Sequence, residues 1–275
     1  MVYLNEFNAT TLGYRHSGEP EWNGELRDLA CKHKNEEQEI KTDIGEHHIT
    51  HLTIDGDRHL SLADIAPHMT HLRLRNSSAV ESLETFTTLK KLELCRIDLS
   101  LEWPSLPANS LEELRVIDCK MKTLPSCFGS LKSLRKFNIS RNPVEVLPES
   151  ITALSSLEEL NLSHCWISQL PESLGSLKSL RKLNLCGNPI EVLPESITAL
   201  SSLEELDLSH CNIGQIPDSF IQLQKLKVLR ITGYSELSIY DGLQTFPEVV
   251  TKLTSLEDLD LSNNWIYELP DSCTH

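Results

Sequence analysis

A short pattern of leucines returns at a fixed interval along most of this 275-residue chain. One copy opens with Leu111-Glu-Glu-Leu114-Arg-Val116. The next copies, each 23 residues after the one before, begin at Leu134, Leu157, Leu180, Leu203 and Leu226. Looser copies begin upstream at Ile49, Met69 and Leu89, and a last one begins at Leu256, after a longer step of 30 residues. This regular interval predicts about ten stacked repeats, because one copy alone cannot bury its apolar side chains.

The copy that begins at Leu157 indicates how one repeat folds. Leu160 and Leu162 are two residues apart, so a strand would point both to the same side. Pro171 ends this part of the repeat, and residues 172–177 lead back as a short helical or extended segment. Stacking would therefore align parallel strands on one face. About four apolar side chains per repeat would be buried, worth roughly 6–10 kcal/mol before the cost of chain ordering.

The repeated motif reads Leu-x-x-Leu-x-Leu-x-x-(Asn/Cys)-x-(Leu/Ile)-x-x-Leu-Pro and resembles the leucine-rich-repeat family over residues 49–275. Copies that continue as Leu-Pro-Glu-Ser-Ile, as at 147–151, resemble its Ras-regulator-like and bacterial effector types. The resemblance implies an α/β repeat fold: a right-handed, curved solenoid with a parallel concave sheet. It also implies that a protein partner binds on the concave face.

One motif position alternates between cysteine and asparagine. Its occupants are Cys119, Asn142, Cys165, Asn188 and Cys211. In the leucine-rich-repeat family this residue turns inward and bonds to neighbouring backbone. A buried Asn satisfies both carbonyl and N–H groups, and Cys is a small apolar residue with a weak donor. Residues 134–156 and 180–202 are nearly identical and 46 residues apart, so the alternation predicts a duplicated block of two repeats.

Both ends of the chain differ from the repeat. In residues 1–48 a helical stripe is formed by Pro20, Trp22, Leu26, Leu29, Ala30 and His33. We expect a short N-terminal helical cap on the first repeat, with a ligase-recruiting segment as the alternative. The last repeat stops at His275, midway along its return segment. We expect either that the natural chain continues or that this uncapped edge meets a partner, and that the present chain self-associates or frays there.

Composition argues against several classes of partner. A net charge of −15 disfavours nucleic acid and anionic lipid. No apolar run approaches the roughly 20 residues that span a membrane, and residues 1–17 show no signal pattern. The sequons at Asn138 and Asn161 fall inside predicted strands, where a glycan would block the sheet. We therefore expect a cytoplasmic protein with reduced cysteines, or one secreted into a host cytoplasm if it is an effector.

Histidines and cysteines suggest chemistry that the repeat explains more simply. His51 and His71 share a motif position and should stand about 4.8 Å apart on adjacent strands, a spacing at which two imidazoles could hold a metal. The next residue in that row is Lys91, a poor neighbour for a cation, so we favour a solvated polar face. The eight cysteines form no Cys-x-x-Cys pair. We expect no metal, no cofactor and no catalytic residue in these 275 residues.

Charge alternates in sign at the two positions after the first leucine of each repeat. The pairs are Lys90-Lys91, Glu112-Glu113, Arg135-Lys136, Glu158-Glu159, Arg181-Lys182 and Glu204-Glu205. Opposite charges would face each other on neighbouring strands, each pair worth a few tenths of a kcal/mol. We interpret the stripe as a self-neutralising ladder that sets register, with a binding stripe as the alternative.

The candidate partner-binding residues lie outside both the alternating Cys/Asn position, which we call the Cys/Asn ladder, and the charge ladder. On the concave side these are Asn138, Arg141, Asn161, His164, Asp207, His210 and Arg230. Where the chain leaves a strand they are Trp166 and Trp265, which alternatively only cover aliphatic stems along the loop edge. The longer repeat adds Tyr234 and Tyr240. Its 7 extra residues lie within Thr232–Thr245, on a loop that we expect to contribute to binding.

These features predict a protein–protein recognition module, for example a bacterial effector that acts in a host cell. The alternative is the substrate-binding part of a larger enzyme such as a ubiquitin ligase. A third hypothesis is a structural spacer without a specific partner. The sequence contains no nucleophile with a matching base and no phosphate loop, which favours the first hypothesis.

Overall fold

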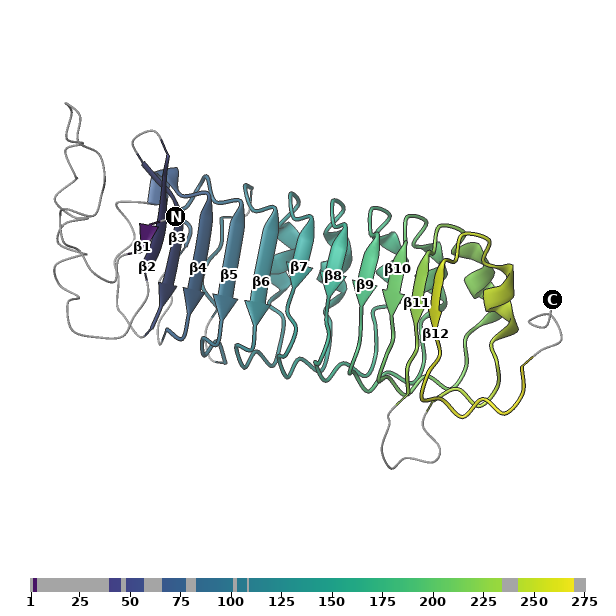
Figure 1. Cartoon of the computed structure of the whole chain (residues 1–275). Coiled ribbons are helices and arrows are strands. Elements are labelled where there is room, and N and C mark those ends of the chain that lie inside the picture. Colours follow the sequence, from purple (N-terminus) through teal and green to yellow (C-terminus); the bar gives the residue numbers. More distant parts are fainter. Residues whose placement is uncertain are drawn as a thin grey trace.

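The chain folds into one long sheet whose strands follow the order of the sequence. The computed structural model describes residues 2–3, 40–45, 48–56, 66–77, 83–100, 103–107, 109–233 and 242–269. Its strands are β1 (Val2–Tyr3), β2 (Ile40–Gly45), β3 (His48–Asp55), β4 (His71–Arg75), β5 (Lys91–Cys95), β6 (Glu113–Ile117), β7 (Lys136–Asn138), β8 (Glu159–Asn161), β9 (Lys182–Asn184), β10 (Glu205–Asp207), β11 (Val228–Arg230) and β12 (Asp258–Asp260). Figure 1 shows them side by side along the molecule.

The strands from β3 to β12 are all parallel and pair at equivalent motif positions. Leu160 of β8, for example, is level with Leu183 of β9, which is level with Leu206 of β10. Each of these strands begins within two residues of a repeat start expected from the sequence, so the predicted stack is confirmed. The constant step keeps register because a shift by one residue would turn every leucine to the wrong face.

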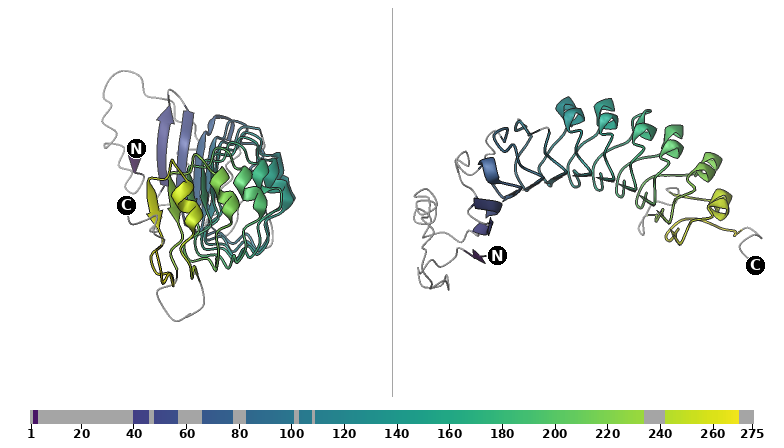
Figure 2. Two further views of the ribbon diagram at one scale, coloured as in Figure 1. Left: turned by 90° about the vertical axis from the view of Figure 1, so that its right-hand side faces the viewer. Right: turned by 90° about the horizontal axis from the view of Figure 1, so that it is seen from above.

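Short 3-10 helices cover the back of the sheet: η1 (Ala66–His68), η2 (Ser126–Ser130), η3 (Glu149–Ala153), η4 (Leu174–Ser176), η5 (Glu195–Ala199), η6 (Asp218–Gln222) and η7 (Glu248–Lys252). A proline precedes most of them, as Pro148 does η3, and its fixed φ of −70° suits a helix start. Figure 2 shows the helices on the outer, convex side and the sheet on the concave side. None of the helices in the described ranges is long and apolar enough to cross a membrane.

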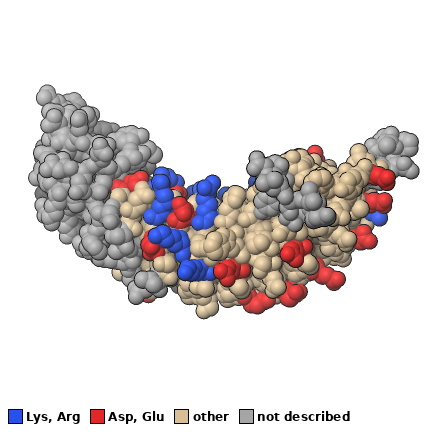
Figure 3. Space-filling view, turned by 90° about the horizontal axis from the view of Figure 1, so that it is seen from below, with Lys and Arg blue, Asp and Glu red and all other residues tan. Residues whose placement is uncertain are grey.

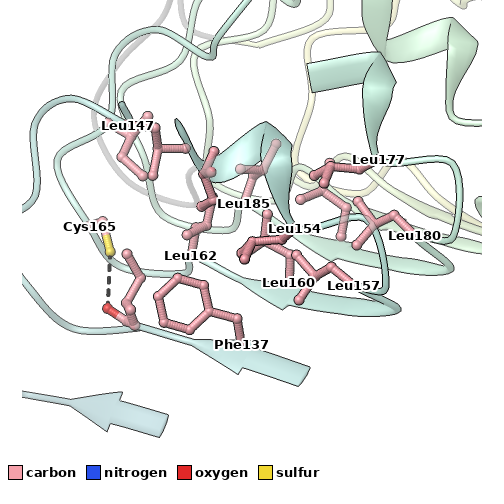
Figure 4. Packing of buried hydrophobic residues seen from close by; sticks show 14 of the residues in the cluster. Phe137, Leu147, Leu154, Leu157, Leu160, Leu162, Cys165, Leu177, Leu180 and Leu185 are labelled. Carbon is pink, nitrogen blue, oxygen red and sulfur yellow. Dashed lines mark hydrogen bonds between the residues drawn. The ribbon is translucent and has the colours of Figure 1, made fainter. Parts of the chain in front are cut away.

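The core lies between the sheet and these helices. In the strands from β4 to β11 the central apolar residues are buried while their sequence neighbours remain partly exposed, as in the Glu159–Asn161 strand, whereas Leu259 of β12 is 37% exposed. Figure 4 shows Phe137 in the layer formed by Leu160, Leu162 and Leu185. Leu160 and Leu185 are 1% and 0% exposed, so each repeat completes the core of the next. The helix side of each repeat is wider than the strand side, so the stack curves with the sheet on its concave face (Figure 2).

The N-terminal edge departs from the parallel pattern. β2 pairs antiparallel with β3, with Lys41 opposite Thr53, and β1 pairs antiparallel with β2. The sequence of residues 1–48 predicts a helical cap and does not predict these strands. The helix expected around residues 20–33 lies outside the described residues. An antiparallel strand removes the unpaired backbone edge that β3 would otherwise present.

Candidate protein-binding surface

Buried asparagines hold the loops that follow the strands. Asn142 Nδ2 donates to the carbonyls of Val116 and Ile139 at 2.7 and 2.8 Å. Its Oδ1 accepts from the backbone N–H groups of Cys119 and Met121 at 2.9 and 3.2 Å. Asn188 repeats this arrangement two repeats later. One amide therefore satisfies both donors and acceptors of the adjoining loops, as the sequence predicted.

The cysteines that alternate with these asparagines in the Cys/Asn ladder are equally buried but form weaker hydrogen bonds. Cys165 Sγ lies 3.5 Å from the Ile139 carbonyl, and Cys211 Sγ lies 3.3 Å from that of Leu185. Figure 4 shows the Cys165 contact. Burial raises the pKa of Cys119 and Cys165 to about 11 and that of Cys211 to about 12. These thiols are poor nucleophiles because the reactive thiolate is scarce at neutral pH.

The residue just before the ladder adopts the left-handed conformation in repeat after repeat. Arg96, Arg141, His164 and His210 have φ between 54 and 61° there, and Gly187 has φ of 71°. This conformation turns the chain so that the next residue enters the core. A Cβ on Gly187 would lie 2.6 Å from Nδ1 of His164, so the histidine side chain occupies the space above the glycine. These side chains line the edge where the strands end.

A row of asparagines runs along the middle of the concave sheet. Asn138, Asn161 and Asn184 are level with one another in β7, β8 and β9. Each Oδ1 accepts the backbone N–H two residues later, at 2.9 Å in all three. This bond fixes each side chain, while Nδ2 has no hydrogen-bond partner within the described residues. The sheet therefore presents three oriented N–H donors about 4.8 Å apart. We call these three residues the amide row.

The amide row continues into charged residues toward the C-terminus. Asp207 of β10 is level with Asn184, and its carboxylate accepts the Ser209 N–H at 2.9 Å. Arg230 of β11 is next, and its guanidinium donates to Asp258 at 2.8 Å. A partner that crosses this face therefore meets donors first, then an acceptor and then a neutralised ion pair.

Ion pairs neutralise the neighbouring row of the sheet. Lys136 Nζ lies 2.8 Å from Glu159, and Lys182 Nζ lies 2.6 Å from Glu205. One position earlier in the chain, the same pairing joins Lys90 to Glu112, Arg135 to Glu158 and Arg181 to Glu204. The predicted opposition of charge on adjacent strands is therefore present. The pairs are largely exposed, so each contributes register more than stability.

The two histidines near the N-terminus stack on each other. The ring centroids of His51 and His71 are 3.9 Å apart, closer than the strand spacing expected from the sequence, and the rings are tilted by 16°. Each Nδ1 faces the threonine that precedes it, at 2.9 Å. Burial lowers the pKa of His71, and His51 lowers it further. No group of three metal-ligating side chains occurs among the residues that the structure describes.

The candidate residues divide between the sheet and its edge. Asn161, Asp207 and Arg230 lie on the same row of the sheet, whereas Arg141, His164 and His210 lie at the edge. Trp166 and Trp265 lie in the loops beyond that edge, 62% and 39% exposed. Tyr234 and Tyr240 lie outside the described residues. Asn184 is not among the residues predicted from the sequence, although its position in the motif matches that of Asn161.

The longer repeat rejoins the regular path at Leu243. Its N–H donates to Asn264 Oδ1 at 3.0 Å, as that of Ile167 does to Asn188 in a regular repeat. Its carbonyl accepts from Trp265, as that of Val144 does from Trp166. The additional residues therefore lie between Gly233 and Leu243, inside the window expected from the sequence.

Comparison with known proteins supports this architecture. A family model described as "Leucine-rich repeat region" matches residues 172–265, and one described as "Leucine Rich Repeat" matches 156–177. Neither description distinguishes the 23-residue type of repeat from other leucine-rich repeats. No curated protein matches the chain.

Three solved structures share the fold. The Leptospira interrogans leucine-rich-repeat protein LIC12759 has a TM-score of 0.52 at 22% identity, over 77% of this chain and 71% of that one. The internalin InlF from Listeria monocytogenes has a TM-score of 0.50 at 20% identity, over 80% and 82%.

The third is the ectodomain of the Arabidopsis thaliana receptor kinase GASSHO1/SCHENGEN3, in complex with CASPARIAN STRIP INTEGRITY FACTOR 2. It has a TM-score of 0.64 at 23% identity, over 81% of this chain but only 27% of that one. At such identities the likeness concerns the fold alone. Together with the family matches and the stacked parallel strands, it shows that this chain has the leucine-rich-repeat fold and that residues 156–265 match the leucine-rich-repeat family.

Proposed function

We propose that the chain is a protein-recognition module that binds an extended segment of a partner across its concave sheet. The amide row carries this proposal: Asn138, Asn161 and Asn184 present N–H donors that the fold has already oriented. A partner with backbone carbonyls or polar side-chain acceptors gains hydrogen bonds without paying to order these side chains. The leucine-rich-repeat fold is consistent with this role.

The chemistry of the surface favours binding over catalysis. Amide side chains neither titrate near neutral pH nor act as nucleophiles. The pKa of Cys186, the thiol beside the row, is raised by burial and by Asp207. The described cysteines are all free. We therefore propose that the protein functions in a reducing cytoplasm, either that of the cell that makes it or that of a host that receives it as an effector.

A substitution that changes the amide row without changing the loop is the sharpest test. Asn161→Asp keeps the oxygen that accepts the Ser163 N–H, as Asp207 does naturally for Ser209. It replaces the exposed N–H donor by an acceptor. Affinity capture from the native cells, quantified by mass spectrometry, should then lose the specific partner by tenfold or more, while the melting temperature stays within a few degrees.

The matched control changes the charge equally on the convex side. Gln222→Glu lies on η6 and is exposed, so it should leave capture unchanged. Equal recovery of the partner by wild type and Asn161→Asp would contradict binding on the amide row. A wild-type chain that captures no specific partner would favour a structural spacer.

We also propose that the longer loop between Gly233 and Leu243 contacts the partner through Tyr240. Deletion of the 7 extra residues, and separately Tyr240→Ala, should weaken partner binding by tenfold or more with little change in melting temperature. Unchanged affinity in both variants would restrict the site to the concave sheet.

A further inference from the structure

The loops that follow β5, β6 and β7 carry a concentration of positive charge. Arg96, Lys120, Lys122 and Arg141 are all exposed there. Figure 3 views the molecule from the side on which the strands end, and shows Lys and Arg gathered in this part of the edge. Further toward the C-terminus the same view shows mainly acidic residues. This local excess stands out in a chain whose net charge is −15.

Three of these cations have no carboxylate partner. Lys120 Nζ pairs with Asp98 at 2.9 Å. Arg96, Lys122 and Arg141 form no ion pair within the described residues. By contrast, the nearby arginines of the sheet are engaged, since Arg115 pairs with Glu113 at 2.7 Å. The loops therefore offer cations that internal acids do not neutralise.

The backbone conformation at Arg96 and Arg141 is a second, independent indication that these two arginine side chains have a role in binding. Both residues have positive φ, 54 and 61°. In other repeats the equivalent position is occupied by Asp118, His164, Gly187, His210 and Asn263, and these residue types adopt that conformation more readily than arginine does. An arginine at such a position is unfavourable for folding, so its presence indicates a role for the side chain itself.

Exposed apolar side chains lie in the loop of Arg141 and in the loop of the next repeat. Val146 and Trp166 are 70% and 62% exposed. Val146 belongs to the same loop as Arg141 and forms a backbone bridge with Gln169 of the next loop. The backbone N–H of Trp166 donates to the Val144 carbonyl at 3.1 Å, so the backbone of Trp166 lies directly beside that loop. The two neighbouring loops that include Arg141 and Trp166 therefore carry both unpaired positive charge and exposed apolar surface.

We propose that Arg96, Lys122, Arg141, Val146 and Trp166 form an edge patch that docks an acidic segment of a protein partner, with apolar residues following the acidic ones. The proposal rests on the function proposed above and adds a second contact, outside the concave sheet. The patch extends over the loops of four successive repeats, about 15 Å, which matches roughly five residues of extended chain.

A protein segment suits the edge patch better than nucleic acid does. Asp98 and Asp118 belong to the same loops as Arg96 and Lys122, and Glu145 belongs to the loop of Arg141. A polyphosphate chain would meet these carboxylates and the acidic remainder of the molecule, whereas a short acidic peptide can place its charges against the arginines alone. The exposed Trp166 then provides contact area for the apolar residues that follow.

The test uses the full chain and a fluorescent peptide with a run of glutamates followed by leucines. We compare wild type with a triple variant, Arg96→Asn, Lys122→Gln and Arg141→Asn. Asparagine tolerates positive φ, so this variant should melt at the same or a higher temperature. Fluorescence anisotropy at low salt should show at least tenfold weaker peptide binding. Wild-type affinity should fall steeply with added salt, as exposed charges are screened.

Matched variants and probes make the result specific. Lys132→Gln, Lys178→Gln and Lys252→Gln remove the same charge from the convex side and should leave binding unchanged. Trp166→Ala should weaken the glutamate–leucine peptide but not a peptide whose leucines are replaced by serine. A peptide with lysines in place of glutamates can bind only the acidic remainder of the molecule, so the triple variant should not bind it more weakly than wild type does.

Four outcomes would overturn the edge patch. They are no binding of the glutamate–leucine peptide by wild type, equal weakening in the convex variant, no effect of Trp166→Ala, or tighter binding of a single-stranded RNA of similar length. The native partner separates this proposal from the concave one. If Asn161→Asp loses that partner and the triple variant keeps it, the edge patch fails while the proposed function stands.

Discussion

Repeats that carry a ladder asparagine and repeats that carry a ladder cysteine place these residues in equivalent slots. Asn188 is 0% exposed and Cys165 is 2% exposed. The asparagine nevertheless donates to three carbonyls and accepts one backbone N–H. The thiol only approaches two carbonyls, at 3.5 and 3.8 Å. Equal burial therefore conceals very different bonding.

The difference shows how a repeat tolerates cysteine, whose sulfur is a poor hydrogen-bond acceptor for backbone N–H groups. Before a cysteine rung, the loop satisfies its own backbone: the N–H groups of Val144 and Ile190 bond to the carbonyls of Asn142 and Asn188 at 2.8 Å. Before an asparagine rung, the corresponding N–H of Ile167 bonds to Asn188 Oδ1 instead. Alternate loops thus use two solutions to the same requirement, and the period of this alternation matches the duplicated block of two repeats.

The largest effect should appear in thiol chemistry. Raising a thiol pKa from 9.0 to about 11, as burial does for Cys119 and Cys165, lowers the thiolate fraction about a hundredfold at neutral pH. Iodoacetamide should therefore label these two cysteines at least a hundredfold more slowly than the exposed Cys127. Peptide mass mapping after timed pulses measures this. Comparable rates without denaturant would contradict the buried ladder.

The next effect concerns the asparagine rung. We expect Asn188→Ala to lower the free energy of unfolding by about 1–3 kcal/mol, because the Ile167 N–H and the Leu162 and Leu185 carbonyls lose a buried partner. Urea unfolding followed by circular dichroism gives the value. A cost below that of the corresponding cysteine substitution would reverse the comparison.

The cysteine rung should be less sensitive. Cys165→Ala should cost about 1 kcal/mol, mainly through the lost packing of one sulfur atom, since its hydrogen bonds are weak. The same urea titration checks this.

The stability of the protein at alkaline pH tests the burial of Cys165 separately. The folded state holds the Cys165 proton more tightly than the unfolded chain does, so the resulting stabilisation is complete below pH 9 and is lost as the pH rises toward 11. The alanine variant should therefore lose less stability than wild type between pH 9 and 11. A parallel decline in both proteins would argue that this thiol does not differ from an unfolded one.

The smallest effect separates burial from bonding. Asn264 makes the same set of bonds as Asn188, to Leu243, Ile231 and Leu261, but is partly exposed. Water can replace its bonds, so Asn264→Ala should cost only about 0.5–1 kcal/mol. If it costs as much as Asn188→Ala in the same urea titration, the number of bonds rather than their burial decides the energetics.

Much of the fold was predictable because it is local and periodic. The positions of Leu160 and Leu162 within one repeat indicate a strand with one buried face, and the constant interval then places the next strand beside it. The inward direction of Asn188, the opposition of Arg181 and Glu204, and the site of the extra residues before Leu243 follow from the same alignment of repeats.

Other features could not be derived from the repeat. β2 lies outside the motif, and nothing in the alternation of residues 40–45 distinguishes an antiparallel edge strand from a loop. The free N–H groups of the amide row depend on an Oδ1 bond to the loop backbone, which requires the actual turn geometry. The left-handed conformation of Arg96 and Arg141 is equally unexpected, because those residue types do not favour it.

The sequence by itself determined the stack: strand positions, register, the two ladders and the repeat that is longer than the rest. These follow from side-chain polarity at a fixed interval, which leaves one arrangement that buries the leucines. Only the tertiary structure decided which polar atoms remain available to a partner. An exposed side chain belongs to a binding surface when neighbours from other repeats neither bond to it nor neutralise it. That depends on distances between residues more than 20 positions apart, as between Lys120 and Asp98.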